Sequence, residues 1–257
     1  MKSEVPASDE HPHVGDQPGV SDLADSSDRS ETVQHIRLIK PLAASGDALR
    51  EHDAPALGVP MTRLGASSPF GLALPDAQPS ASTMYAPRGV WLDDQRLIAC
   101  DSGNHRVLIW NQIPESDQTP ADTVLCQPSF DSEGPAAHGR GPENGVHLPT
   151  GVIVADGRLL VCDAWHHRVL VWNRVPDRSD APPDFAIGQE SLSQVEINRG
   201  AGPTRESLYW PYGVAWLDGR LYIADTGNRR VVGWDGFPED ARPCDVVLGQ
   251  ADPHGGE

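Results

Sequence analysis

The chain repeats itself at a constant interval of 62 residues. The motif Pro-x-Gly-Val begins at Pro87, Pro149 and Pro211. The same interval relates three aspartates, three arginines and three tryptophans: Asp101, Asp163 and Asp225; Arg106, Arg168 and Arg230; and Trp110, Trp172 and Trp234. Self-similarity at a fixed period indicates stacked supersecondary units. We therefore expect a row of similar units, with the three tryptophans packed between neighbours.

The third copy shows the local structure of one unit most clearly. Residues 213–217 form a short apolar run, Asp218-Gly219 is a typical hairpin turn, and residues 220–225 read as the returning strand. Residues 230–234 and 245–250 add a third and a fourth strand. Four short antiparallel strands per repeat are typical of a propeller blade. The predicted fold class is therefore all-β, a β-propeller.

Each copy also carries a more specific pattern. It reads Gly-Val, Asp-Gly, Leu, Ala/Cys-Asp and then Gly-Asn-His/Arg-Arg-Val-(Leu/Val)-x-Trp, over about residues 85–250. This pattern resembles the NHL repeat, the blade unit of six-bladed NHL β-propellers. The resemblance implies that the Asp and Arg of each copy form a structural clamp, and a bidentate Arg–carboxylate pair does fix geometry. The predicted clamp residues are Asp101, Arg106, Asp163, Arg168, Asp225 and Arg230.

The repeats leave the start of the chain unassigned. Residues 1–31 are rich in Ser, Asp, Pro, Gly and His, and we expect a disordered acidic tail there. Residues 32–84 are expected to hold N-terminal strand(s), including Thr32–Leu42, and a Pro/Gly-rich connector, which together form at most a partial, degenerate blade. The blades are assigned to residues 85–147, 148–209 and 210–257.

Three blades do not close a propeller, which typically uses about 4 to 8. Met61–Gly65 ends 22 residues before Pro87, where the last strand of an earlier blade would fall. Three closures remain open. In the first, two copies join head to tail as a six-bladed homodimer. In the second, a degenerate first blade gives a small ring or an arc that another protein completes. In the third, the chain is shortened relative to a longer parent.

Composition excludes several classes of partner. The net charge of −17 argues against nucleic acid, which binds basic surfaces. No apolar stretch approaches the roughly 18 residues of a membrane span, and the start lacks a signal peptide's apolar core. We therefore expect a cytoplasmic protein that does not bind membranes. Four cysteines without a C-x-x-C pair predict reduced, partly buried thiols and neither a metal nor a cofactor; they are Cys100, Cys126, Cys162 and Cys244.

The second copy departs from its sisters in one turn. Where the others have Gly-Asn, it has Trp165-His166, followed by His167. A Trp in a turn at the propeller rim is either a plug against the next blade or an exposed anchor for a partner, since Trp is enriched at interface hot spots. The two histidines are neighbours whose side chains point to opposite faces, which disfavours joint metal ligation. Trp165, His166 and His167 are thus the candidate partner contacts.

The sequence holds no recognisable catalytic machinery. No G-x-S-x-G, Walker A, H-E-x-x-H or dinucleotide motif occurs, and we interpret Ser102 as a turn residue. The resemblance implies a non-catalytic protein-interaction scaffold. The expected cytoplasmic location and the missing catalytic residues further suggest an accessory or assembly subunit of a bacterial multi-protein enzyme complex, for example a redox complex. The alternative is a metal-dependent lyase or lactone hydrolase with its site in the central channel and with His105 and His167 as candidate ligands.

Overall fold

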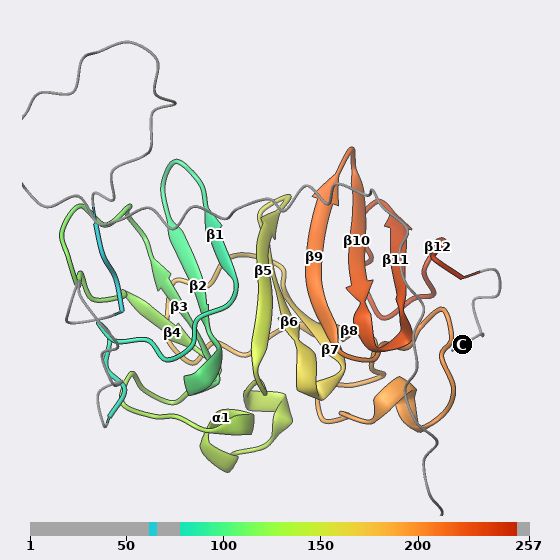
Figure 1. The fold of residues 1–257 in the computed structure, drawn as a ribbon, viewed down its shortest axis with the longest axis horizontal. Helices are drawn as coiled ribbons and strands as arrows, with labels where there is room; N and C mark the ends of the chain where they lie inside the picture. The colour runs from blue at the N-terminus through green and yellow to red at the C-terminus, as the bar shows by residue number, and fades with distance from the viewer. Residues whose placement is uncertain (1–61, 66–77, 251–257) are drawn as a thin grey trace, which may run out of the picture. The chain divides into compact units, whose positions relative to one another are not determined.

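The described residues form three four-stranded antiparallel sheets. The structure is a computed structural model that describes residues 62–65 and 78–250. The predicted all-β fold of three propeller blades is confirmed, and the three sheets follow one another side by side (Figure 1). Blade 1 contains β1 (Val90–Leu92), β2 (Leu97–Asp101), β3 (Arg106–Trp110) and β4 (Thr123–Leu125). Blade 2 contains β5 (Pro149–Ala155), β6 (Arg158–Asp163), β7 (Arg168–Trp172) and β8 (Phe185–Ile187). Blade 3 contains β9 (Pro211–Leu217), β10 (Arg220–Asp225), β11 (Arg230–Asp235) and β12 (Val246–Leu248).

The turns explain why the chain reverses where it does. Asp218 and Gly219, between β9 and β10, have φ of 50° and 75°, and Asp156 and Gly157 have φ of 50° and 77°. Two consecutive residues at positive φ make the type I′ turn that suits a two-residue hairpin. The turn from the second to the third strand is a short 3-10 turn in every blade, such as Ala164–His166. Among the described residues, the one short α-helix is α1 (Pro135–Gly139), between blades 1 and 2.

The hydrophobic core lies between the blades rather than within one. Val107 and Ile109 of β3 pack with Val161 of β6 and with Trp172 of β7, all of them at most 2% exposed. The next interface repeats this arrangement and includes Trp234. Because neighbouring strand residues point to opposite faces, each blade supplies one apolar face to each neighbour. A blade therefore needs neighbours on both sides to bury its apolar residues.

Arg63–Gly65 lies beside blade 1 at the place of an earlier blade's outer strand. Gln118 N–H donates to the Arg63 carbonyl at 2.8 Å, just as Asp180 N–H, in the next repeat, donates to the Val124 carbonyl at 2.9 Å. Arg63 thus takes the position that Val124 of β4 takes one blade later. The predicted tail 1–31 and the predicted strand Thr32–Leu42 lie outside the described residues.

The described residues also bear on the predicted cysteine thiols and on the question of a membrane span. All four cysteines are buried and free, and burial raises the pKa of the Cys100 and Cys162 thiols well above the usual range. Both thiols therefore stay protonated and unreactive at neutral pH. None of the helices among the described residues is long and apolar enough to cross a membrane.

Candidate functional site

Each blade contains a buried ion pair between its second and third strands. The distances from Arg Nε to Asp Oδ2 are 2.7 Å for Arg106–Asp101, 2.8 Å for Arg168–Asp163 and 2.8 Å for Arg230–Asp225, and all six side chains are fully buried. In blade 2, Arg168 Nη2 also donates to the carbonyls of Pro142, at 2.6 Å, and Gly145, at 3.0 Å. The arginine thus holds the chain that leads into its own blade, and its buried charge is paired.

The second oxygen of each aspartate holds the entry to the inner strand. Asp163 Oδ1 accepts the His147 N–H at 2.6 Å, two residues ahead of Pro149. The equivalent bonds in blades 1 and 3 run from Tyr85 to Asp101 and from Tyr209 to Asp225, both at 2.7 Å. A carboxylate that accepts several charged and backbone donors in a dry site is held in one orientation. The six predicted clamp residues therefore meet in three equivalent clusters.

The structure places His166 inside the clamp of blade 2. Its Nδ1 lies 2.9 Å from Asp163 Oδ2, where Asn104 and Asn228 donate their amides in the other blades. Burial acts to raise the pKa of the Asp163 carboxyl, but the nearby Arg168 and His166 lower it below its usual range. His166 is only 8% exposed, so its ring offers little surface to a partner.

His105 and His167 tie each blade to the next. His105 Nδ1 accepts the Leu148 N–H at 3.1 Å, and His167 Nδ1 accepts the Trp210 N–H at 3.4 Å. A neutral imidazole that accepts at Nδ1 carries its proton on Nε2. A histidine that binds a metal through Nε2 needs the opposite tautomer. These two bonds therefore oppose metal ligation by either ring, and the described residues contain no group of three metal-ligating side chains.

These histidines make the stability of the protein depend on pH. Burial lowers the pKa of His105 and of His167 from 6.5 to about 4. Between those values the unfolded chain binds more protons than the folded one, so stability is present near neutral pH and is lost as the pH falls toward 4.

We expect a double variant, His105→Asn with His167→Asn, to lose this dependence, because the asparagine carbonyl can accept the same amide without titrating. Between pH 7 and 5 the wild type should lose about 2–4 kcal/mol more than the variant, because each ring contributes at most about 2 kcal/mol and partial exposure reduces this. Urea unfolding at both pH values measures the difference. Equal losses would show that the pKa of each ring is the same in the folded and the unfolded chain.

Trp165 is the exposed member of the three candidate contacts, with 45% of its surface accessible, against 7% for His167. Its ring lies between those of His147 and Trp210, with centroid distances of 5.4 and 5.8 Å. Such tilted aromatic contacts fix a ring without covering it. The indole is thus held in place while nearly half of it faces solvent.

A compensating exchange makes room for this tryptophan. In blades 1 and 3 the turn has Gly103 and Gly227, where an added Cβ would lie 2.3 Å from the Tyr85 ring and 2.5 Å from the Tyr209 ring. Blade 2 has the smaller ring of His147 at the tyrosine position. Blades 1 and 3 therefore pair a large ring, tyrosine, with a glycine. Blade 2 pairs a smaller ring, histidine, with a tryptophan at the same two positions. The repeat alignment contains this signal, but it becomes meaningful only once the two positions are known to touch.

Ring contacts continue from blade 1 to blade 3. His105 contacts His147 at 5.1 Å between centroids, Trp210 contacts Tyr209 at 4.6 Å, and Tyr209 contacts His167 at 5.3 Å. We call the set the aromatic row: His105, His147, Trp165, Trp210, Tyr209 and His167. Beside it Ser102 is fully buried, and its hydroxyl donates to the Pro149 carbonyl. The row can therefore stack and donate hydrogen bonds, and Ser102 is not placed to attack a substrate.

A hollow of about 820 Å³ lies away from this row, in the loops of blade 1. Trp110, Ile113 and the carboxylates of Asp94, Glu115 and Asp122 are among the residues that line it. Asp122 is engaged in the fold because its Oδ2 accepts the Asn111 N–H at 2.8 Å. The lining pairs no nucleophile with a base, so the aromatic row remains the candidate functional site.

No protein-family model and no curated protein matches the chain. Solved structures that resemble it include Kuenenia stuttgartiensis hydrazine synthase, at 12% identity and a TM-score of 0.40, over 72% of this chain and 40% of that one. The WD40 β-propeller domain of Doa1 has 12% identity and a TM-score of 0.35, over 62% and 42%. A chain of a nidogen/laminin complex has 16% identity and a TM-score of 0.35, over 65% and 48%. The chain thus spans less than half the length of each, and we take the fold from the sheets themselves.

Proposed function

We propose that the protein is a non-catalytic protein-interaction scaffold built on an NHL-type β-propeller, which binds its partner through Trp165. The observation that carries the proposal is the half-exposed indole of Trp165 at a turn where the sister blades have glycine. A ring already fixed by His147 and Trp210 loses little rotamer freedom on binding, and Trp is enriched among the residues that dominate interface energies.

The chemistry around Trp165 supports a protein partner over a small substrate. The histidines of the row are neutral near pH 7, because burial lowers the pKa of His105, His147 and His167. The row therefore offers aromatic faces and imidazole N–H groups without a charge, which resembles the core of a protein interface more than a catalytic site. The proposed partners include a second copy of the chain. They include neither nucleic acid nor a membrane.

The fuller proposal is an accessory or assembly subunit of a bacterial multi-protein enzyme complex, including redox complexes, in the cytoplasm. The exposed ring of Trp165 supports a role in contacting other subunits. The thiols of Cys100 and Cys162, which burial keeps protonated, are consistent with a role that holds subunits together. The metal-dependent lyase or lactone hydrolase needs imidazole ligands. The backbone amides bound at Nδ1 of His105 and His167 oppose that reading, and a stoichiometric bound zinc or calcium ion in the purified protein would revive it.

Photo-crosslinking tests the scaffold directly. Benzoylphenylalanine at position 165 is expected to give a discrete adduct of higher mass in cells of the source organism, and excess wild-type protein should compete it away. The matched control is position 113, because Ile113 is 40% exposed but lies in the loops of blade 1 away from the row. The same adduct from both positions would mean that Trp165 does not mark the contact.

Binding of the identified partner then separates an anchor from a plug. Trp165→Ala should weaken binding by at least about tenfold, as expected for a hot-spot tryptophan, while the melting transition stays close to that of the wild type. Retained binding together with a lost melting transition would instead assign Trp165 to the packing between blades 2 and 3.

A further inference from the structure

In blades 1 and 2, a glycine at the start of the inner strand lies against the backbone of the next blade. A Cβ built on Gly89 would lie 2.7 Å from the Thr150 carbonyl oxygen, and one on Gly151 would lie 2.9 Å from the Tyr212 carbonyl oxygen. At Gly213 the nearest atom is the Ala224 Cβ of its own sheet, at 3.7 Å. Blade 3 therefore keeps the space for a neighbouring backbone although no described residue fills it.

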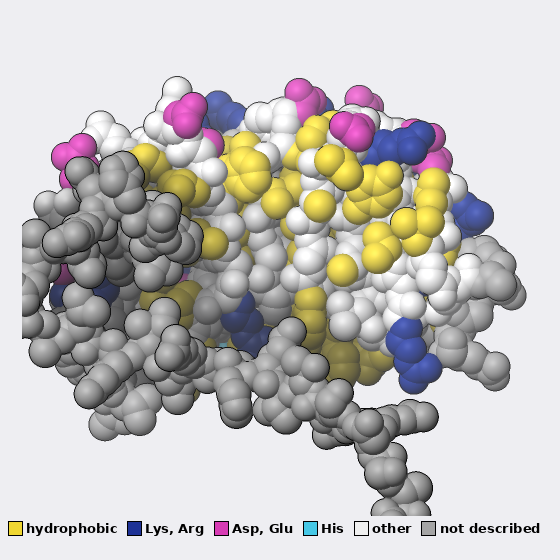
Figure 2. Space-filling view, turned by 45° about the horizontal axis from the view of Figure 1, so that its top comes forward, with side chains coloured by type: hydrophobic (Ala, Val, Ile, Leu, Met, Phe, Trp, Pro, Cys, Tyr) yellow, Lys and Arg dark blue, Asp and Glu magenta, His cyan; other side chains and the backbone are white. Residues whose placement is uncertain are grey.

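The side chains on this face of blade 3 show the same vacancy. In blade 2 the corresponding face packs on blade 3, and Leu160, Cys162 and Val169 are completely buried. Their equivalents Tyr222, Ala224 and Val231 are only half-buried, and Leu248 of β12 is 51% exposed. Figure 2 shows hydrophobic side chains gathered on the surface of the described part, below a rim of charged ones. The face is apolar and lacks a partner among the described residues.

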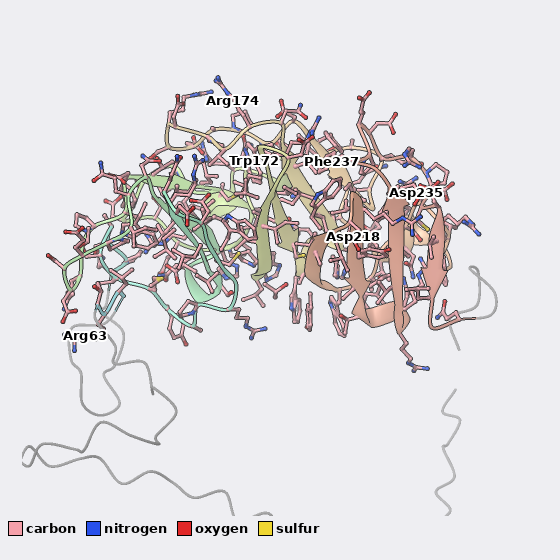
Figure 3. All side chains as sticks on the ribbon, turned by 90° about the horizontal axis from the view of Figure 1, so that it is seen from above. Arg63, Trp172, Arg174, Asp218, Asp235 and Phe237 are labelled. Atoms are coloured by element: carbon pink, nitrogen blue, oxygen red, sulfur yellow. The ribbon has the colours of Figure 1, made fainter. Side chains whose placement is uncertain are left out.

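Blade 1 offers the complementary face. Val152 and Leu159 of blade 2, which pack on blade 1, are 5% and 0% exposed. Part of the equivalent face of blade 1 is open, because Val90 is 66% exposed and Leu97 lines an apolar hollow of about 310 Å³, whereas Trp110 on the same face is buried beside Leu64. Figure 3 shows Arg63, beside blade 1, and Asp235, on blade 3, toward opposite ends of the row of blades. The two open faces therefore belong to the two ends and do not cover each other.

We propose that these faces are the two halves of one blade-to-blade interface, and that two copies of the chain close head to tail into a six-bladed ring. The occupant of the Gly213 face is blade 1 of the second copy, with its inner strand opposite Gly213. This interface would continue the one already formed twice within the chain, in which each blade is fitted to the next. The inference rests on the second-copy part of the proposed function and does not involve Trp165.

Arg63–Gly65 must leave when the ring closes. A docked blade 3 brings its own outer strand, β12, and the repeat places Val247 of that strand where Arg63 now accepts the Gln118 N–H. Arg63 is held by Asp117 at 2.8 Å, in a pair whose side chains are 32% and 50% exposed. Exposed pairs contribute little, and the segment is short. We therefore assign Arg63–Gly65 as a stand-in that covers blade 1 until a second copy displaces it.

One contact of the repeat is missing at the new interface. Within the chain, His105 and His167 accept the amide of the residue before the next blade's proline. At this position blade 3 has Arg229, which has donors only. The second copy's Ala86 N–H would thus find no acceptor, which predicts a ring that dissociates on dilution. Arg229→His should restore the acceptor and strengthen the ring.

Light scattering coupled to size exclusion, over a range of concentrations, tests the proposal on the full chain. The wild type should move toward twice the 27.7 kDa of one chain as concentration rises. Gly213→Val should raise the dissociation constant by at least about tenfold, since a side chain would enter the packed interface. The matched control is Gly202→Val, at a glycine that also has open space and no positive φ. Arg63→Glu and Arg229→His should each lower the constant.

The outcomes separate this inference from the role of Trp165. The ring is overturned if the wild type, Arg63→Glu and Arg229→His all stay monomeric. It is also overturned if a dimer forms but Gly213→Val and Gly202→Val affect it equally. The ring is supported if Gly213→Val abolishes the dimer while the photo-crosslinked adduct from position 165 stays unchanged. Circular dichroism melting of every variant shows whether each is folded when its mass is measured.

Discussion

Replacing Arg168 by methionine is expected to lower the free energy of unfolding by about 3–5 kcal/mol, the cost of leaving a buried charge without its partner. Asp163 would remain fully buried, and the carbonyls of Pro142 and Gly145 would lose a donor. The change should also remove the ion pair that favours the charged form of Asp163. Denaturant unfolding followed by tryptophan fluorescence and by circular dichroism measures the loss.

The matched control is Arg220→Met. Arg220 pairs with Asp235 at 2.7 Å, a distance like that of the buried pair, but the two side chains are 53% and 61% exposed. Solvent screens an exposed pair and leaves it little effect on stability, so this variant should resemble the wild type. Similar losses from the two variants would contradict the view that burial, rather than the ion pair itself, makes the clamp important.

The second large effect should come from Gly151. Its substitution by valine places a Cβ 2.9 Å from the Tyr212 carbonyl oxygen and 3.1 Å from Cys162 Sγ. Neither the backbone of blade 3 nor a fully buried thiol can move aside easily, so we expect a loss of about 1–3 kcal/mol. Both blades at that interface should unfold earlier in denaturant.

Gly213→Val is the matched control, because it makes the same change at the equivalent position of blade 3. There an added Cβ meets only the Ala224 Cβ, at 3.7 Å, and valine suits a strand better than glycine does. At concentrations where the protein is monomeric, this variant should be as stable as the wild type or slightly more so. A comparable loss at both positions would mean that the glycines serve the strand itself and not the approach of the next blade.

The repeat predicts the blades well because its signals are local. The hairpin at Asp218-Gly219 and the pairing of Asp225 with Arg230 depend on residues close in sequence, and the structure shows both. The 62-residue step then carries the same inference to the other copies. The outer strands are less well predicted, since β12 spans only Val246–Leu248 of the expected 245–250. A short strand at the periphery depends on its neighbour more than on its own sequence.

The candidate site could be predicted only in part. The sequence marks Trp165 as unusual, but whether it is exposed depends on His147 and Trp210, which come from loops 18 and 45 residues away. The buried place of His166 depends on its equivalence to Asn104 in the clamp. The bonds at Nδ1 of His105 and His167 join residues 43 positions apart. Contacts between blades decide the bonds of His105 and His167 and the contact of Trp165 with Trp210, and a pattern within one blade does not contain them.

The clamp of each blade also determines how the chain comes apart. Its aspartate holds the entry to the inner strand, its arginine holds the incoming loop, and both lie at the junction of the second and third strands. No strand near this junction can leave without exposing a buried charge, so a blade opens as a whole. Between blades the contacts are mainly apolar and involve only nearest neighbours. We therefore expect the monomer to unfold as a short one-dimensional array whose cooperative unit is one repeat, with its end blades opening before the middle one.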